Sequence, residues 1–209
     1  MAEHKILIAG GGTGGHLFPA LAIGEEIHHR EPGAKIHYVG SNFGLEAKVF
    51  PVKDVWHTLL PIRGFQRGIS LQSLGRNSLL PVRIIRSMLK IRSLMNEFLP
   101  QVVVGTGGYA SALPLYMASK KNNPLPIILQ EQNSYPGMTT RWFADKAKTI
   151  CVAFNDANTH LESDTVLTGN PVRHGIADGN PQRGFKEFKL AEDHKTIFLF
   201  GGSQGSAYL

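Results

Sequence analysis

The sequence predicts an α/β fold with a doubly wound, parallel sheet of the Rossmann-like type. Short apolar or β-branched segments alternate with helix-like segments along most of the chain, and several of the turns between them are rich in glycine. Strands that alternate with helices form parallel sheets, because each helix returns the chain to the same end of the sheet. Ligands of such sheets bind at the carboxyl ends of the strands, so we expect the functional site there.

The expected strands are short apolar runs: Lys5–Ala9, Lys35–Val39, Val55–Leu60, Gln101–Val104, Pro126–Leu129, Thr149–Ala153 and Thr165–Leu167. Between them, helix formers and helix-period spacing predict helices at Phe18–His29, at about Ser111–Lys120, and from the Pro136-Gly137 turn to Lys146. Together these elements would form a first domain over residues 1–170.

A change in composition predicts a domain boundary after this unit. Residues 171–195 mix prolines and glycines with charged residues, which is typical of an interdomain linker. Thr196–Phe200 is a new apolar strand candidate, and a glycine-rich loop follows it. We therefore expect residues 196–209 to be the first strand and glycine loop of a truncated second domain.

The composition indicates a folded protein with an anionic partner. The 209 residues are 42% hydrophobic and 18% charged, and 22 Lys and Arg against 16 Asp and Glu give a net charge of +6. Cys151 is the single cysteine, which excludes an intramolecular disulfide and a thiolate metal cluster and fits a reducing compartment. The N-terminus does not resemble a signal peptide, and no apolar run reaches the roughly 18 residues of a membrane span, so we expect a cytoplasmic protein.

Two glycine loops follow expected strands. Gly10–Gly15 lies between the first strand and helix, and Gly105–Tyr109 repeats the arrangement after the fourth strand. Backbone N–H groups of such loops can bind an anion at a helix N-terminus, although each loop could also be only a tight turn. The acidic residue that a dinucleotide-binding domain has after its second strand is missing from Val39–Asn42, which argues against an oxidoreductase.

Two residues are candidates for proton transfer. His16 would lie at a helix N-terminus, where the helix dipole keeps imidazole neutral and able to accept a proton; alternatively, it orients the loop. Glu131 opens a Glu-Gln-Asn segment after the fifth strand, where it could bind sugar hydroxyls or be part of an ordinary polar loop. The histidines show no metal-binding spacing, and we expect no metal and no cofactor.

A basic, amphipathic segment occupies residues 63–95. No acidic residue occurs from Val55 to Asn96, while basic residues alternate with apolar ones. This composition favours an anionic membrane surface, with Arg83, Arg86 and Lys90 as the expected contacts. A core helix with a solvated basic face is the alternative. Nucleic acid is disfavoured, because no aromatic platform or binding module accompanies the charges.

Five segments together resemble the MurG family of glycosyltransferases, and they occur in that family's order: Ile6–Pro19, Gly107–Pro114, Gln130–Gly137, Thr168–Arg173 and Gly201–Ser206. The resemblance implies transfer of N-acetylglucosamine from UDP-N-acetylglucosamine to lipid I, which yields the peptidoglycan precursor lipid II. It also implies a two-domain GT-B fold, in which the N-terminal domain holds the acceptor and the C-terminal domain holds most of the nucleotide.

The same resemblance implies roles for individual residues. Positions that contact the donor correspond to Thr13, Gly14, Gly15, Asn133, Arg173 and Ser203, and those implicated in acceptor binding or catalysis correspond to His16, Tyr109 and Glu131. His16 is the first candidate for the base and Glu131 the second. Gln130 departs from the family, in which many members have histidine. A peripheral protein on the cytoplasmic face of the membrane is implied, and the 209-residue chain by itself is expected to be inactive or only a binding module.

Overall fold

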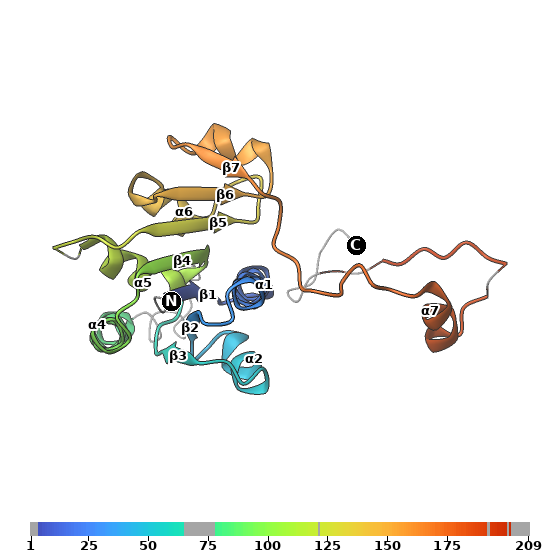
Figure 1. Ribbon diagram of the computed structural model, residues 1–209, viewed down its shortest axis with the longest axis horizontal. Coiled ribbons are helices and arrows are strands. Elements are labelled where there is room, and N and C mark those ends of the chain that lie inside the picture. Colours follow the sequence, from blue (N-terminus) through green and yellow to red (C-terminus); the bar gives the residue numbers. More distant parts are fainter. Residues whose placement is uncertain (1–3, 65–77, 121, 192, 200, 202–209) are drawn as a thin grey trace.

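The computed structural model describes residues 4–64, 78–120, 122–191, 193–199 and 201. Its central feature is a seven-stranded sheet with the strand order β3-β2-β1-β4-β5-β6-β7, shown in Figure 1. Every neighbouring pair of strands is parallel. The strands are β1 Lys5–Gly10, β2 Lys35–Ser41, β3 His57–Leu60, β4 Val102–Gly107, β5 Ile127–Glu131, β6 Thr149–Val152 and β7 Thr165–Leu167. The predicted fold class is confirmed, as are the seven strands predicted before residue 171.

Helices cover both faces of this sheet (Figure 1). The helices are α1 Gly14–Arg30, α2 Glu46–Val52, α4 Leu80–Phe98, α5 Tyr109–Lys120, α6 Met138–Phe143 and α7 Pro181–Phe188, with short 3₁₀ turns η1 Ala144–Lys146 and η2 Asn155–His160. The three helices predicted in the first domain are present, as α1, α5, and α6 with η1. The sequence analysis did not anticipate α2 and α7.

Two apolar clusters separate the helices by face. Side chains alternate along β1: Leu7 and Ala9 pack with α4, α5 and α6, and Ile8 packs with α1 and α2. This alternation is the ordinary period of a strand, and both faces are apolar because both are covered. The face that carries α4, α5 and α6 also carries the cavity described below.

The centre of the sheet is irregular where β1 and β4 end. Ala9 pairs with Gly105, but the next residue, Gly10, pairs with Gly107, so the register shifts by one residue. The hydroxyl of Thr106, the residue skipped by this shift, donates to the carbonyl oxygen of His16 at 2.8 Å. The order of strands also reverses here, between β1 and β4, and such a reversal is the usual ligand site of this fold.

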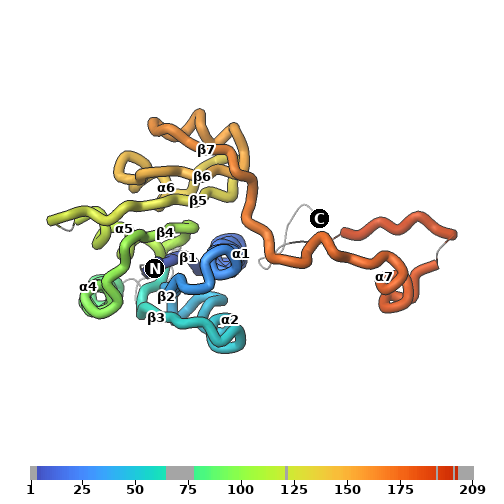
Figure 2. The backbone as a smooth tube through the Cα atoms, in the orientation of Figure 1, coloured from blue at the N-terminus to red at the C-terminus, as the bar shows by residue number. Residues whose placement is uncertain are grey.

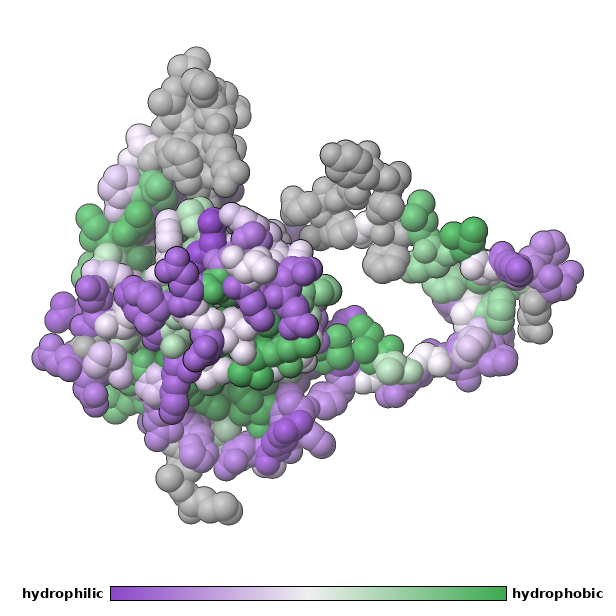
Figure 3. Space-filling view, turned by 90° about the horizontal axis from the view of Figure 1, so that it is seen from above, coloured by the Kyte–Doolittle hydropathy of each residue, from purple (hydrophilic) through white to green (hydrophobic). Residues whose placement is uncertain are grey.

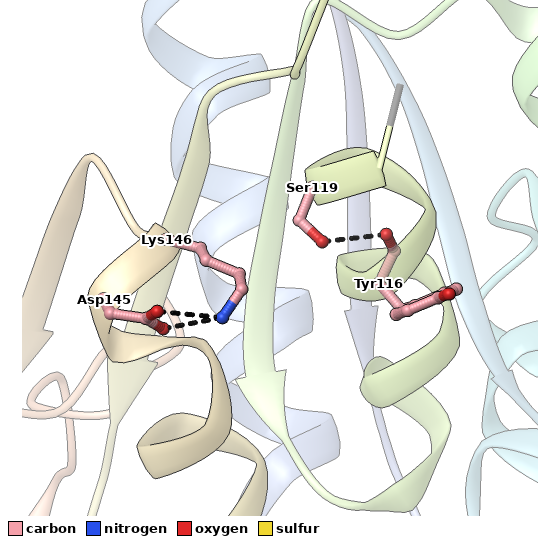
Figure 4. A network of polar contacts seen from close by, with 4 residues as sticks. All are labelled: Tyr116, Ser119, Asp145 and Lys146. Carbon is pink, nitrogen blue, oxygen red and sulfur yellow. Dashed lines mark hydrogen bonds and ion pairs between the residues drawn. The ribbon is translucent and has the colours of Figure 1, made fainter. Parts of the chain in front are cut away.

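At the amino ends of the strands, opposite the expected ligand site, the polar contacts shown in Figure 4 are local. Near the end of α5 the Ser119 hydroxyl donates to the Tyr116 carbonyl at 2.9 Å, and in η1 Lys146 pairs with its neighbour Asp145 at 2.9 Å. An exposed ion pair of this kind contributes about 0–1 kcal/mol to stability. These contacts secure element ends and bring together no residues distant in sequence.

After β7 the chain leaves the sheet and runs away from it, as Figure 2 shows. The expected linker contains α7, whose N-cap Asn180 accepts hydrogen bonds from Gln182 N and Arg183 N. Residues 196–199 do not form the predicted strand. A strand needs a neighbour for its backbone hydrogen bonds, and Ile197, the most exposed large apolar residue of this stretch, is 91% exposed. Figure 3 shows hydrophobic atoms among hydrophilic ones in this outlying part.

Among the described residues no helix has both the length and the apolar character needed to cross a bilayer.

Candidate functional site

The two glycine loops lie against each other at the carboxyl ends of β1 and β4, as predicted. Gly107 and Gly108 have positive φ angles of 97° and 77°, which glycine adopts without strain. A Cβ atom at Gly107 would lie 2.6 Å from Cδ2 of His16, and one at Gly108 would lie 2.1 Å from the Gly11 carbonyl oxygen. The second loop therefore provides room for the imidazole ring and for the first loop.

His16 lies in the first turn of α1, with a hydrogen-bond partner on one ring nitrogen. Its Nδ1 is 3.1 Å from the hydroxyl oxygen of Thr13, the N-cap residue of the helix. Burial lowers the pKa of His16 below its usual value, and the carboxylates of Glu131 and Glu46 oppose this shift. Burial therefore favours the neutral ring, whereas the sequence analysis expected neutrality from the helix dipole.

Glu131 ends β5 and is only 2% exposed. Its Oε1 accepts from the backbone and side-chain amides of Asn133, at 3.1 and 2.8 Å. Its Oε2 accepts from Gly137 N at 2.9 Å and from the Thr140 hydroxyl at 2.6 Å. Four donors thus hold this carboxylate between the loop after β5 and helix α6, an arrangement that favours a structural role in shaping the loop over proton transfer.

Gln130 and Gln132 link β5 to its neighbours. Gln132 Nε2 donates to the Thr106 carbonyl at 2.8 Å and also to the side-chain oxygen of the buried Gln130. From the segment after β7, Asn170 Nδ2 donates to the Gln132 carbonyl at 3.4 Å. Two of the segments that carry the family resemblance, Gln130–Gly137 and Thr168–Arg173, therefore meet beside β4.

Glu46 is a buried acidic residue that the sequence analysis missed. It is the first residue of α2 and is fully buried. Both carboxylate oxygens accept from Gly12 N at 3.0 Å, and Oε1 accepts from Ser41 N at 2.8 Å. The sequence does contain a signal for this residue, because glycines precede it after the second strand. A Cβ atom at Gly40 or Gly44 would collide with the Glu46 side chain, so glycine is needed at both positions.

A cavity of about 560 Å³ opens beside His16. Its polar side includes His16, Glu131 and Thr139, and its apolar side includes Leu80, Ile84 and Trp142 from α4 and α6. Tyr109 and Arg63 also line it. The Tyr109 hydroxyl lies 3.5 Å from Ser41 Oγ, and burial raises the pKa of this phenol. The cavity can hold a ligand that is polar at one end and apolar at the other.

One side of helix α4 packs against the core, and the other side carries an exposed stripe of apolar residues. Ile91, Leu94 and Met95 face the core, while Val82, Ile85 and Leu89 are 48%, 59% and 62% exposed. This outer stripe follows the i, i+3, i+7 spacing of one helix face.

The three predicted membrane contacts on α4 differ in their surroundings. Arg83 lies over the Phe43 ring, 5.2 Å from its centroid, and Lys90 donates to the Leu59 carbonyl at 2.8 Å. Arg86 is exposed beside the apolar stripe of Val82, Ile85 and Leu89. The basic residues Arg67 and Arg76 of the same predicted segment lie outside the described residues.

The predicted donor contacts are distributed over several elements. Thr13, Gly14 and Gly15 form the start of α1, and Asn133 lies across the sheet in the loop after β5. Arg173 lies over the ring of Phe18, 5.6 Å from its centroid, so it contacts the first turns of the same helix. Ser203 and its glycine loop lie outside the described residues.

Curated relatives match nearly the whole chain. A Flavobacterium psychrophilum protein is 39% identical over 209 residues, covering 99% of this chain and 55% of its own length. A Bacillus subtilis protein is 37% identical over 204 residues, covering 97% of this chain and 54% of its own length. Both are named UDP-N-acetylglucosamine–N-acetylmuramyl-(pentapeptide) pyrophosphoryl-undecaprenol N-acetylglucosamine transferase. The chain thus spans about half the length of the curated relatives it matches.

Solved structures show the same fold. The crystal structure of Acinetobacter baumannii MurG superposes with a TM-score of 0.63 at 23% identity, covering 84% of this chain and 47% of that one. A Rickettsia africae glycosyltransferase gives 0.55 at 12% identity, covering 92% and 51%. A family model, the glycosyltransferase family 28 N-terminal domain, matches residues 6–152, which include β1 to β6 and the whole cavity. The chain belongs to glycosyltransferase family 28, whose N-terminal domain it carries.

Proposed function

We propose that this chain is the acceptor-binding part of an inverting glycosyltransferase that moves N-acetylglucosamine from UDP-N-acetylglucosamine to lipid I, forming lipid II. The names of the relatives support this reaction. The single observation that carries it is the cavity beside His16, which joins a predominantly neutral imidazole to an apolar wall. A polyprenyl diphosphate sugar has the matching chemistry: a hydroxyl to be activated and a hydrocarbon chain to be covered.

In this proposal His16 is the general base. The role requires the tautomer in which Nδ1–H donates to Thr13, so that the Nε2 lone pair takes the proton of the attacking acceptor hydroxyl. Glu131 shapes the loop that carries Asn133, and Tyr109 binds the acceptor inside the cavity. A base of this kind contributes about 10²–10⁴-fold to the rate.

The donor binds at the start of α1. The N–H groups of Gly14 and Gly15 belong to the first helical turn, which has no preceding turn to accept them, and the helix dipole there favours negative charge. Arg173, beside Phe18, adds a cation that can stabilise the departing diphosphate. Thr13, Asn133 and Ser203 complete the donor contacts. We place the domain boundary in residues 171–195, with the nucleotide-binding domain beginning at about residue 196.

The acceptor is anchored in lipid, and α4 provides a surface for that lipid. Val82, Ile85 and Leu89 would enter the interface of an anionic membrane, with Arg86 at the headgroups. The protein would then be peripheral, on the cytoplasmic face, where the nucleotide sugar is available.

Vesicle sedimentation tests this surface. We expect Arg86→Gln to weaken binding to anionic vesicles by about 1 kcal/mol, and the triple change at Arg83, Arg86 and Lys90 to weaken it further. Lys48→Gln, at an exposed residue of α2 on the other face of the sheet, is the matched control. Equal binding to anionic and neutral vesicles would show instead that α4 is a core helix with a solvated face.

Product formation tests the reaction itself. A protein of the relatives' length that contains this sequence should convert UDP-N-acetylglucosamine and lipid I to lipid II. The 209-residue chain alone should bind lipid I but turn over negligibly. Turnover by that chain alone would refute the proposal that it only binds the acceptor. Failure of the longer protein to form lipid II would refute the proposed reaction.

A further inference from the structure

A carboxylate lies beneath the first glycine loop, where the sequence predicted an open place for an anion. Glu46 is fully buried, and its oxygens accept from the backbone of Gly12 and Ser41 at 2.8–3.0 Å. A Cβ atom at Gly11 would lie 2.3 Å from Glu46 Oε1. Burying a carboxylate is costly unless it is hydrogen-bonded, and here the glycines leave space for it and the backbone supplies the donors.

This contact changes the role of Gly12. Its N–H group already donates to Glu46, so this donor is not free for a phosphate oxygen. The first glycine loop therefore contains its own anion, and only the N–H groups at the start of α1 remain for a ligand. Gly12 directly precedes Thr13, whose hydroxyl meets His16 Nδ1 at 3.1 Å.

The charged and titratable groups around His16 come from four elements or their ends. Glu131 comes from β5, Glu46 from α2, Tyr109 from α5, and Arg63 from the segment after β3. Glu131 is held by four donors from the loop after β5 and from α6. Glu46 instead bonds to the loop that carries the partner of His16, so it can affect the imidazole both through geometry and through charge.

We propose that Glu46 is a positioning residue for the base. Its carboxylate holds Gly12 so that Thr13 meets His16, and its negative charge stabilises the imidazolium that forms when His16 takes the proton. The inference rests on the proposed role of His16, and it assigns to α2 a part in the reaction although Glu46 does not line the cavity.

The first experiment measures His16 directly, by an NMR pH titration of the 209-residue chain, with the resonance assigned through His16→Gln. In Glu46→Gln the amide oxygen can still accept from Gly12 and Ser41, but the charge is gone. We expect the pKa of His16 to fall by about 0.5 or more, since a nearby negative charge favours the protonated ring. Glu97→Gln, an exposed position at the end of α4, is the matched control and should leave that pKa unchanged.

A second variant separates geometry from charge. Glu46→Asp keeps the charge but shortens the reach to Gly12, so the pKa of His16 should stay closer to that of the unmodified chain than in Glu46→Gln. In the full-length enzyme we expect Glu46→Gln to shift the acidic limb of the kcat/KM profile to lower pH and to lower kcat with little change in KM. Glu46→Asp should lower kcat without that shift.

The outcomes distinguish this inference from the proposed function. An unchanged His16 pKa in Glu46→Gln would overturn the electrostatic role of Glu46. If His16→Gln inactivates the enzyme but both Glu46 variants have normal kcat, the inference is overturned and the proposed function is not. Full activity of His16→Gln would instead overturn the function of the base, whatever the titration shows.

Discussion

Two histidines of this domain, the partly buried His16 and the buried His37, have lowered pKa values, yet their surroundings differ. At His16 burial is opposed by two carboxylates, Thr13 meets one ring nitrogen, and the ring lines a cavity. At His37, in β2, burial and the charge of His57 both act to lower the pKa, to about 4. Its Nε2 meets Thr58 Oγ1 at 2.9 Å, and its buried Nδ1 has no hydrogen-bond partner among the described residues.

The difference teaches what a buried imidazole needs in order to act on a ligand. The His37 ring packs with two aromatic rings, with its centroid 5.4 Å from those of Trp56 and Phe98. Among the described residues, no carboxylate raises its pKa. His16 instead has two carboxylates that favour its charged form, and it lines the cavity together with Tyr109 and Arg63. Burial alone therefore does not distinguish the proposed base from a core histidine, and the two positions form a natural pair for experiment.

The largest difference should appear in catalysis. In a protein of the relatives' length that contains this sequence, the proposed role predicts that His16→Gln lowers kcat/KM by about 10²–10⁴-fold, the usual contribution of a general base. His37→Gln should leave kcat/KM within about threefold, because His37 does not line the cavity beside His16. Steady-state kinetics with circular dichroism as a folding control measures both. A near-normal rate for His16→Gln at all pH values would make the two histidines equivalent.

A smaller effect on stability and activity should follow from a substitution that places an extra atom against the His16 ring. Gly107→Ala would place a Cβ atom 2.6 Å from the imidazole at a φ of 97°, and we expect a loss of about 1–3 kcal/mol of unfolding free energy together with lower activity. Gly33→Ala meets nothing within 4 Å and is the matched control. Urea denaturation of the 209-residue chain gives both values, and equal stabilities would contradict the packing described.

The smallest expected effect is the contribution of His37 to the loss of folding stability at acidic pH. Its pKa is about 4 in the folded chain against 6.5 for the free side chain, so between these values the unfolded state binds more protons. Stability contributed by neutral His37 is therefore present above pH 6.5 and is lost as the pH falls towards 4. Thermal unfolding from pH 7 to 4.5 should show a smaller loss for His37→Gln than for the unmodified chain. His28→Gln, an exposed site on α1, should behave like the unmodified chain.

The strands could be predicted from sequence because their apolar runs are short, continuous and separated by clear turns. The place of the site followed from topology, since the carboxyl ends of β1 and β4 are neighbours in a sheet whose strand order reverses there. Helix α7 was missed although Asn180 and Pro181 form an ordinary helix start, because the proline- and glycine-rich composition around it indicated a linker.

Tertiary contacts explain what could not be predicted. The glycines at 107 and 108 suggested a phosphate cradle, but their local sequence cannot show that a histidine ring from residue 16 fills the space above them. Glu46 was missed for the same reason. The sequence analysis considered only residues 39–42 after the second strand, whereas Glu46 comes from the next helix and is buried under the first glycine loop.

The pairing of β1 with β4 has a consequence for synthesis on the ribosome. Ile6 pairs with Val102, so the central strand lacks this neighbour until 96 further residues have been made. At about 5–20 residues per second, the delay is roughly 5–20 s, while β2 is available much earlier. During that interval one edge of β1 is open to other chains, and the cavity beside His16 lacks every lining residue from Gly107 onward. That cavity is thus completed well after the first half of the sheet can form.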